Sequence, residues 1–297
     1  MVEIDILCAG FACYDLVYSV DHHPGDDEKI FASDYTGCGG GPAANAAYIA
    51  ARLGSKAAFA GYLGNDIYGD LHLKEFEQQG VLTDLVIRAN DQTPLTFLLI
   101  KPDGKRTAVN YRKKERYLKK DSIDFAKYSY KAILFDGHES NIAIPLAEYA
   151  RNKNIPTILD AGSLHNGTGK LIHMVDFVIA SEVFAFQFTG EKDDKKALKK
   201  LAAINSTVVI TLGERGSIWH YKGDSGSCPA FSVDVVDTTG CGDAFHGAFT
   251  VGIASGMEWH DLLTFASAAG ALCCTKMGSR PAMPTKKEVL KIVRENP

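Results

Sequence analysis

Several features are missing from this chain of 297 residues, and each absence argues against a class of protein. No apolar run reaches the roughly 20 residues that a membrane-spanning helix needs. The amino end carries no cationic stretch followed by an apolar core, so we expect neither a secretory signal nor a membrane partner. The net charge is −4 and no long basic block occurs, so we expect no nucleic-acid partner.

The cysteines follow no known framework. There are 7 of them, an odd number, and no C-x-x-C spacing occurs. This pattern argues against a zinc site or a set of disulfides and favours a reducing, cytoplasmic environment. A Walker A motif, G-x-x-x-x-G-K-[ST], is also absent, which excludes a P-loop nucleotide site.

The chain does contain two glycine-rich segments, and the later one carries an isolated acid. Residues 235–249 are predicted to form a strand, a tight turn and a helix. Gly240 and Gly242 flank Cys241 and let backbone N–H groups converge, so the turn and the helix start should hold an anion. Asp243 then fits a base that deprotonates an alcohol for attack on a phosphoryl group. The alternative is an ordinary helix-start aspartate.

The earlier glycine-rich segment, residues 37–41, is predicted to be a turn that lets a ligand approach the backbone. A helix should follow from about residue 42 to 53, because Pro42 suits a first helical position and Gly54 a position past the end. Asn45, one turn in, can hydrogen-bond the same ligand. The segment also matches G-x-G-x-x-A, which makes a dinucleotide-dependent oxidoreductase a weaker hypothesis.

The order of the predicted elements indicates two sheets. A first strand is expected at residues 4–10, and Asp15 just beyond it either grips a polyol or caps a turn. Early strand pairs without helices predict a small separate sheet. Its strands are expected at residues 16–20, 29–35, 96–100 and 107–111.

From residue 132 onward strands and helices alternate, which predicts a parallel sheet covered on both faces. Ligands bind at the carboxyl ends of such strands. The polar residues predicted at those ends are Asp136, Asp160, Glu182 and Thr211. Residues 211–216 form a further turn of small residues, suited to a nucleotide's ribose or phosphates.

Four motifs together resemble those of the ribokinase, or phosphofructokinase-B type, family of carbohydrate kinases. They are residues 39–46 (GGGPAANA), 61–69 (GYLGNDIYG), 211–216 (TLGERG) and 237–243 (DTTGCGD), the last with Cys where Ala is usual. The resemblance covers nearly the whole chain and implies an α/β fold: a ribokinase-like three-layer α/β/α domain with a mainly parallel sheet and a small β-sheet lid. The implied large domain comprises residues 1–11, 37–91 and 113–297, and the implied lid comprises residues 12–36 and 92–112.

The resemblance also implies ATP-dependent phosphorylation of a sugar or nucleoside hydroxyl, with Mg²⁺, often a monovalent cation such as K⁺, and a homodimer joined through the lid. The implied catalytic residues are Asp243 as base and Gly240, Cys241 and Gly242 as an anion hole. The implied sugar-binding residues are Asp15, Gly40, Gly41 and Asn45. The implied nucleotide-binding residues are Thr211, Gly213 and Gly216. The implied monovalent-cation positions are Asp237, Thr239, Cys273 and Gly278.

One motif departs from the family pattern. Relatives usually carry Asn-x-x-Glu, tied to magnesium, whereas this chain has Ser181 and Phe184 at those positions. Glu182 keeps a carboxylate nearby and is expected to take over that role through water. The departure is also the one feature that supports a non-catalytic sugar or nucleotide sensor.

The end of the chain narrows the expected substrate. Residues 229–231, 245–247 and 278–281 resemble ketose kinases such as fructokinase, ketohexokinase and sulfofructose kinase. We therefore expect phosphorylation of a primary hydroxyl of a fructose-like ketose. Predicted lid residues that face either an anionic sugar tail or solvent are Lys29, Asn110 and Arg112. The runner-up is an adenosine-like nucleoside kinase, with a base wall of Phe97, Tyr111 and Tyr18.

Overall fold

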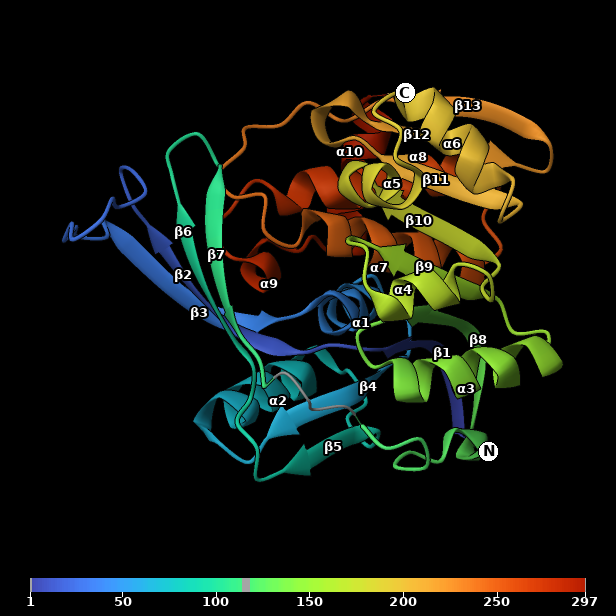
Figure 1. Cartoon of the computed structure of the whole chain (residues 1–297), viewed down its shortest axis with the longest axis horizontal. Helices are drawn as coiled ribbons and strands as arrows, with labels where there is room; N and C mark the ends of the chain where they lie inside the picture. Colours follow the sequence, from blue (N-terminus) through green and yellow to red (C-terminus); the bar gives the residue numbers. More distant parts are fainter. Residues whose placement is uncertain (1, 114–117, 297) are drawn as a thin grey trace.

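The computed structural model describes residues 2–113 and 118–296. A large sheet with helices on both faces forms the body, and a smaller sheet projects from one side (Figure 1). This arrangement confirms the three-layer α/β/α body and the small β-sheet lid that the sequence predicts. We call the small sheet the lid and the rest of the chain the body.

The large sheet is mainly parallel. Within the described residues it has nine strands, of which the two at one edge run antiparallel to their neighbours. From that edge the order is β13 (Asp224–Cys228), β12 (Ser217–Tyr221), β11 (Thr207–Thr211), β10 (Phe177–Ser181), β9 (Thr157–Ala161), β8 (Tyr128–Phe135), β1 (Val2–Ala9), β4 (Ala57–Gly64) and β5 (Val86–Ala89).

Alternating side chains of the central strand β1 lie in two different hydrophobic cores, one on each face of the sheet. Ile6 and Cys8 pack into one core, whereas Leu7 and Ala9 pack into the other. Helices that share the first core are α1 (Pro42–Arg52), α2 (Ile67–Gln79), α7 (Cys241–Ala254), α8 (Trp259–Cys273) and α10 (Lys286–Glu295). Helices that share the second core are α3 (Ser140–Asn152), α4 (Asn166–Leu171), α5 (Glu182–Thr189) and α6 (Asp194–Ala202). The remaining short helices are α9 (Ser279–Ala282), η1 (Phe125–Lys127) and η2 (Gly213–Arg215).

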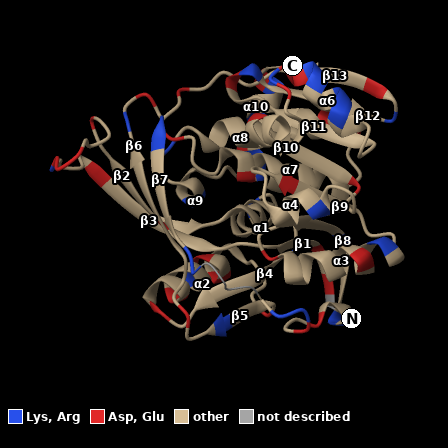
Figure 2. Cartoon of the chain, viewed as in Figure 1, with Lys and Arg blue, Asp and Glu red and all other residues tan. Residues whose placement is uncertain are grey.

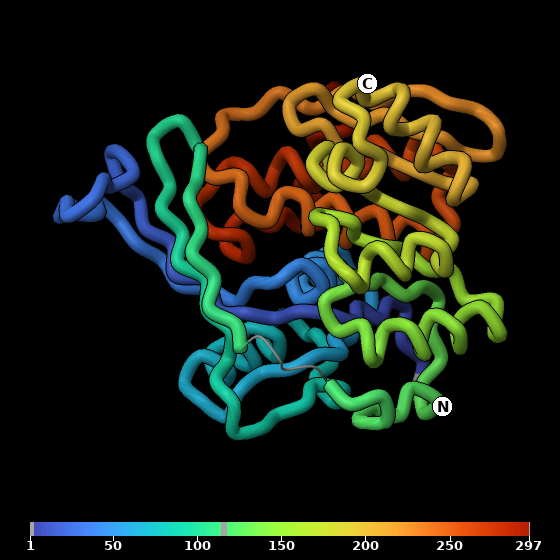
Figure 3. The backbone as a smooth tube through the Cα atoms, in the orientation of Figure 1, coloured from blue at the N-terminus to red at the C-terminus, as the bar shows by residue number. Residues whose placement is uncertain are grey.

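The lid is a four-stranded sheet. Its order is β3 (Asp34–Gly40), β2 (Cys13–Ser19), β6 (Leu95–Ile100) and β7 (Arg106–Tyr111). Val17, Leu98 and Ile100 form a small core with Met277 of the body, while the loop between β2 and β3 stands clear of the body (Figure 3). The lid is therefore anchored to the body along part of its length.

Local signals in the sequence explain where the predicted elements begin and end. α1 starts at Pro42, as predicted, because proline suits a first helical position. α2 begins after Asp66, whose carboxylate accepts a hydrogen bond from the Gly69 amide. β4 spans the predicted residues 57–64, and β8 to β11 confirm the strands predicted after residue 132.

Two predicted segments are wrong. Residues 37–40 are not a turn, because they continue β3 and pair with β2, and the strand begins at Asp34 rather than at residue 29. The strand predicted at Val235 and Val236 does not form. The Val236 amide donates to the Cys274 carbonyl of a helix end instead of to a strand, and both valine side chains are 47% exposed. A β-branched run becomes a strand only where a neighbouring strand takes its hydrogen bonds.

Candidate active site

The turn predicted to bind an anion lies at the start of α7. Gly240 caps the helix with a φ of 78°, a left-handed conformation that favours glycine. A Cβ at this position would also lie 2.5 Å from the Cβ of Ser279. The first amides of a helix have no partner inside it, so those of Gly242 and Asp243 are available to an anion together with the positive end of the helix dipole.

Asp243 is held in this turn by Asn45 of α1. Asn45 Nδ2 donates to Asp243 Oδ2 at 2.7 Å. Arg280 fixes the orientation of that amide, because its Nε, which can only donate, lies 3.3 Å from Asn45 Oδ1. Burial raises the pKa of Asp243, and the hydrogen bond from Asn45 opposes that shift. A carboxylate with a raised pKa beside unpaired amides is suited to accept a proton from a group that meets an anion.

Arg280 is a buried cation to which the sequence analysis gave no role. The side chain is 2% exposed and lies 4.5 Å over the ring of Phe76, and its Nη1 pairs with Glu75 Oε2 at 2.9 Å. The Glu75 carboxylate also accepts from the Gly39 amide at 3.0 and 3.1 Å. A Cβ on Gly39 would lie 2.0 Å from Arg280 Nη1. The glycine at position 39 therefore makes room for this arginine, a reason that the sequence did not reveal.

Asp15 is the second buried carboxylate of the site. It lies in β2 and accepts from Cys13 Sγ at 3.2 Å. A Cβ on Gly40 would lie 2.2 Å from Asp15 Oδ2, and a Cβ on Gly41, with its φ of 99°, would lie 2.5 Å from the carbonyl oxygen of Phe11. Burial raises the pKa of Asp15 to about 6, and the charge of Asp243 raises it as well. The lid carboxylate and the body carboxylate are therefore close enough to interact.

Replacing Asp15 by Asn should stabilise the protein at alkaline pH. The folded protein keeps a proton on Asp15 up to about pH 6, compared with an ordinary value of 3.8. Between those values the folded state binds more protons than the unfolded state, so stability falls as the pH rises. Above pH 6 the full cost, about 3 kcal/mol, applies to the wild type and not to the asparagine variant.

Urea unfolding at pH 8 and at pH 4 measures this difference. The exposed Asp26→Asn substitution is the matched control and should change neither value. An Asp15→Asn variant that is no more stable than wild type at pH 8 contradicts the expectation.

The three residues predicted on the lid, Lys29, Asn110 and Arg112, lie in different places in the structure. In the strand register Asn110 lies opposite Thr96, and Thr96 lies opposite Asp15, so the three side chains are on one face of the lid. Lys29 is exposed in the loop between β2 and β3. This loop lies at the outer end of the lid in Figure 1.

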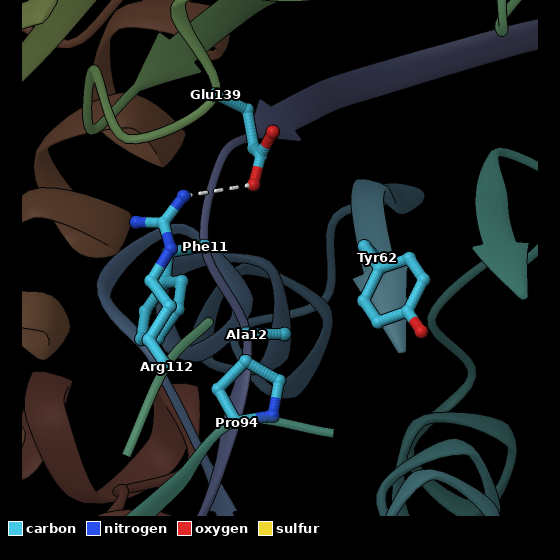
Figure 4. Close-up of a pocket in the computed structure, with 6 residues that line it drawn as sticks. All are labelled: Phe11, Ala12, Tyr62, Pro94, Arg112 and Glu139. Atoms are coloured by element: carbon cyan, nitrogen blue, oxygen red, sulfur yellow. Dashed lines mark hydrogen bonds and ion pairs between the residues drawn. The ribbon is translucent and has the colours of Figure 1, made fainter. Parts of the chain in front are cut away.

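Arg112 turns toward the body. Figure 4 shows its guanidinium paired with Glu139, at 3.2 Å, and it also lies 5.0 Å from the centre of the Phe11 ring. Glu139 is buried, so it balances the arginine charge at the end of β8. The residues around this pair enclose a cavity of about 10 Å³, roughly the room for one water molecule. The cavity is lined by Phe11, Ala12, Tyr62, Pro94, Arg112 and Glu139.

The predicted nucleotide residues lie at the carboxyl end of β11. Thr211 ends the strand, and no heavy atom lies within 4 Å of the place a Cβ on Gly213 would take. Both glycines have a left-handed φ, 61° at Gly213 and 81° at Gly216, but only a Cβ on Gly216 would meet other atoms, 2.2 Å from the Cys228 carbonyl oxygen. Gly213 therefore leaves the backbone open to a ligand, whereas Gly216 shapes the turn.

Glu182 begins α5 and is engaged in a surface ion pair. Arg215 Nη2 lies 2.8 Å from its Oε1, and Arg215 Nη1 lies 2.6 Å from Asp194 Oδ2. Both side chains of the Glu182–Arg215 pair are about half exposed, at 55% and 50%. Exposed pairs contribute little free energy, so this carboxylate can exchange its partner for a hydrated metal ion.

The four residues predicted for a monovalent cation converge behind the anion turn. Asp237 is fully buried, its Oδ1 accepts from the Thr239 amide at 2.8 Å, and its Oδ2 accepts from the Gly278 amide at 2.9 Å. Cys273 Sγ lies 3.8 Å from the Thr239 carbonyl oxygen. The Thr239 hydroxyl is buried and has no hydrogen-bond partner in the part of the chain that the structure describes. Hydroxyl and carbonyl oxygens are the donors that a hard cation prefers, so these residues fit one.

Replacing Gly240 by Ala should displace the anion turn. The change costs about 1–2 kcal/mol for the left-handed backbone, and the new Cβ meets Ser279. Gly80 is a matched control, because its φ is 79° and no heavy atom lies within 4 Å of a Cβ there. We expect Gly80→Ala to lower stability only, and Gly240→Ala to lower stability further and to weaken nucleotide binding, as measured by thermal unfolding and calorimetric titration. Equal effects of the two substitutions argue against a packed turn at Gly240.

Arg106 of β7 also belongs near the site, although no sequence motif marks it. Burial raises the pKa of Asp243, and the positive charge of Arg106 is one of the smaller effects that oppose this shift. A hydrogen bond with Cys274 lowers the pKa of Cys241, and the charge of Arg106 lowers it as well. In the sequence it is one of several basic residues around a hairpin. Only the strand register, which puts Arg106 on the same face of the lid as Asn110, distinguishes it from the others.

The arrangement limits what the site can do chemically. A proton acceptor stands beside an anion-binding helix start, and a second carboxylate reaches the same place from a lid. An anion that meets a deprotonated alcohol in this way is a phosphoryl group. The fold and the site thus fit a phosphotransferase that acts on an alcohol.

Comparison with known proteins agrees with this class. The model of the pfkB family of carbohydrate kinases matches residues 3–286, and the chain belongs to that family. This finding confirms the resemblance seen in the four sequence motifs.

Relatives in the family span almost the same length. Ribokinase of Haemophilus influenzae is 26% identical over 291 residues, covering 94% of this chain and 95% of that protein. Probable fructokinase-5 of Arabidopsis thaliana is 30% identical over 285 residues, covering 86% and 88%. Among solved structures, a putative ribokinase from Agrobacterium tumefaciens superposes with a TM-score of 0.89 at 27% identity, with 98% of both chains covered. Ribokinase of Arabidopsis thaliana complexed with ribose and ATP has a TM-score of 0.84 at 25% identity, with 99% of both chains covered.

The surface and the helices add two observations. Lys and Arg alternate with Asp and Glu over the loops and outer helices, without a large block of one sign (Figure 2). Among the helices of the described residues, none is long and apolar enough to cross a bilayer.

Proposed function

We propose that the protein transfers the γ-phosphoryl group of ATP to a primary hydroxyl of a small sugar, a ketose of the fructose type. The observation that carries the proposal is the placement of Asp243 by Asn45 in the first turn of α7, beside unpaired backbone amides. Similarity to ribokinase and fructokinase relatives supports a sugar substrate. Similarity to a ribokinase complexed with ribose and ATP supports ATP as the donor.

Asp243 acts as the general base. Its free oxygen takes the proton of the sugar hydroxyl as that oxygen bonds to the γ-phosphorus and the bond from phosphorus to the leaving ADP oxygen breaks. The amides at the start of α7 stabilise the negative charge on the transferring group. Asn45 keeps the base in place during this step, and Arg106 adds positive charge from the lid.

The sugar binds between the lid and α1. Asp15 can accept hydrogen bonds from two sugar hydroxyls, and Asn110 lies on the same lid face. The lid covers the site and keeps water from the phosphoryl group. Lys29 and Arg112 remain candidates for an anionic sugar tail, although Arg112 is already balanced by Glu139.

Two cations complete the proposal. Mg²⁺ neutralises the phosphates of ATP when it is bound with them. We assign the contact with this ion, through water, to the carboxylate of Glu182. Its ion pair with Arg215 is exposed and can be exchanged for the ion. Asp237, Thr239, Cys273 and Gly278 are the residues that would hold K⁺ behind the anion turn.

The register of the lid weighs against the nucleoside kinase. Phe97 lies opposite Leu16, and Tyr111 opposite Leu95, so both aromatic rings are on the face of the lid away from Asp15. Tyr18 shares that outer face, since it lies four residues after Tyr14, the partner of Leu95. These rings therefore do not form a wall for a base in the sugar site.

The same outer face supports the proposed homodimer through the lid. Its large apolar side chains are exposed: Tyr35 by 71%, Val109 by 64%, Tyr111 by 49% and Phe97 by 42%. Contiguous apolar surface of this kind is typical of interaction sites. Analytical ultracentrifugation should show a dimer that Val109→Asp converts to a monomer.

Two other hypotheses lose support. A dinucleotide site at residues 39–44 loses support, because Gly39 and Gly40 belong to β3 of the small sheet and not to a turn that follows a strand of the large sheet. A non-catalytic sensor does not need a base held by Asn45. A cytoplasmic location, proposed from the cysteine pattern, suits an enzyme that uses ATP.

An ADP-release screen tests the proposal. The purified protein, with MgATP and with either K⁺ or Na⁺, is offered ketoses, pentoses, ketoses with a phosphate or sulfonate tail, and nucleosides. We expect the highest kcat/KM with a ketose, and an anionic tail that raises it further would implicate the lid cations. No ADP release with any of these acceptors would refute the proposed function, and release only with nucleosides would select the alternative.

A further inference from the structure

A buried ion pair lies directly behind the anion turn, and the mechanism above does not use it. His246 is in the second turn of α7 and Asp160 is near the end of β9, and each side chain is 4% exposed. His246 Nδ1 lies 3.3 Å from Asp160 Oδ2 and 2.6 Å from the Gly242 carbonyl oxygen. On the other side of the ring, Nε2 lies 3.2 Å from the carbonyl oxygen of Ile179, the β10 residue that pairs with Asp160.

All the oxygens that face the ring are acceptors, and this selects its protonation state. A neutral ring with its proton on Nδ1 would set the lone pair of Nε2 against the Ile179 carbonyl. A neutral ring with its proton on Nε2 would set the lone pair of Nδ1 against the Gly242 carbonyl and the Asp160 carboxylate. Only the imidazolium, which donates from both nitrogens, makes every one of these contacts attractive.

The surroundings supply the counter-charge for such a cation. Asp160 Oδ2 has no hydrogen-bond partner of its own within the described ranges, so the imidazolium is the group that compensates it. Burial raises the pKa of Asp160, and the imidazolium opposes that shift. Asp243 of α7 and Asp136 at the end of β8 are the other charged groups that act on Asp160. The charge of His246 lowers the pKa of both Asp160 and Asp243, against the larger effect of burial, so two acids share this imidazole.

We propose that His246, charged and held by Asp160, is a positioning residue for phosphoryl transfer that orients the peptide between Gly242 and Asp243. This inference rests on the proposed kinase function. The peptide bond is planar and trans, so its C=O and N–H point in opposite directions. Within α7 the Gly242 C=O points along the helix toward His246 and the Asp243 N–H points toward the open helix start, and the contact of Nδ1 with the Gly242 oxygen at 2.6 Å holds this peptide there. The imidazolium also adds a positive charge behind that turn.

A purely structural role would not require these residues. Removing two charges from water is costly, and an apolar pair of similar volume usually stabilises a core as well as a buried ion pair or better. An ion pair directly behind the anion turn is better explained by what it does to the turn. Stability and catalysis are separable here, which makes the proposal testable.

The ring state can be measured without any substrate. Two-dimensional ¹H–¹⁵N spectra of imidazole groups are recorded on the wild-type protein at pH 8, and the signal missing from His246→Gln is assigned to His246. We expect its two nitrogens to have the nearly equal shifts of an imidazolium. Asp160→Asn should convert them to the separated shifts of a neutral ring. A neutral ring in the wild type at pH 8 overturns the proposal.

Kinetics then test the effect on the turn. His246→Gln retains a donor of similar reach but no charge, and we expect kcat to fall roughly 10–100-fold, as when an outer partner of a site is removed, with little change in the KM for the sugar. Asp160→Asn should give the same loss, and the double variant should be no worse than either single variant, because the two residues act as one unit. His173→Gln, at an exposed position, is the matched control and should keep the wild-type kcat.

The alternatives give different results. Additive losses in the double variant, or an unchanged kcat in His246→Gln with a lower Tm, overturn the positioning role. If His246→Gln does not fold, the ring state of the wild type and the kinetics of Asp160→Asn still decide. A wild-type protein that phosphorylates none of the acceptors contradicts the proposed function instead, and the ring state remains an independent result.

Discussion

Replacing Asp243 by Asn should lower kcat roughly 10²–10⁴-fold, the range expected for loss of a general base. The substitution keeps the shape of the side chain, and the new amide oxygen can still accept the 2.7 Å hydrogen bond from Asn45 Nδ2. The fall in kcat would therefore result from the loss of the proton acceptor and not from a collapse of the turn. Steady-state ADP release at saturating ATP and sugar measures it.

Asp261 offers a matched control for the alternative role of a helix-start aspartate. Asp243 is the third residue of α7, and Asp261 is the third residue of α8, where it is exposed. Asp261→Asn should leave kcat unchanged and lower stability by only about 0.3–1 kcal/mol, through the helix dipole. If Asp243→Asn behaves in the same way, Asp243 is a helix-start residue and the proposed mechanism is wrong.

The pH dependence of the wild type should follow from the same group. Burial raises the pKa of Asp243 above its ordinary value of 3.8. A base works when deprotonated, so kcat/KM should be constant above the raised pKa and should fall as the pH drops through it.

Replacing Arg280 by Met should have the largest effect on stability, about 3–5 kcal/mol, because it removes one partner of a buried ion pair. Glu75 would lose the guanidinium at 2.9 Å, and His72 Nε2 would lose a donor at the same distance. Asn45 would lose the contact that fixes its amide. For a chain of this size the expected fall in Tm is on the order of 10 °C.

Arg215→Met is the control for the loss of an arginine as such. Arg215 makes two ion pairs at 2.6 and 2.8 Å, but its side chain is 50% exposed, so its loss should cost no more than about 1 kcal/mol. Adding Glu75→Met to Arg280→Met should restore part of the lost stability, because the unpaired carboxylate is then gone. Denaturant unfolding of the variants measures these differences, and an Arg280→Met protein as stable as wild type contradicts this role.

The two glycine-rich segments show how much of the candidate site sequence motifs can predict. The segment before α7 was predicted to be an anion-binding turn with Asp243 beside it, because glycine spacing and helix-start signals are local properties. The segment at residues 37–41 was predicted to precede α1, as it does, but its strand conformation and the packing of other side chains against two of its glycines were not predicted. The spaces beside Gly39 and Gly40 hold Arg280 and Asp15, which come from α9 and β2.

By itself the sequence determined the alternation of strands and helices, the parallel sheet, the turn before Asp243 and the strand end at Thr211, whereas Asp15, expected between two strands, lies within β2. Period, capping and turn residues encode such features within a few neighbouring positions. Tertiary structure alone decided that Val235 and Val236 have no strand partner, and that Phe97 and Tyr111 face outward. It alone placed Arg280 against Asn45 and His246 against Asp160. Contacts of this second kind depend on sheet order and strand register, which join residues 86 to 235 positions apart, and no local pattern encodes them.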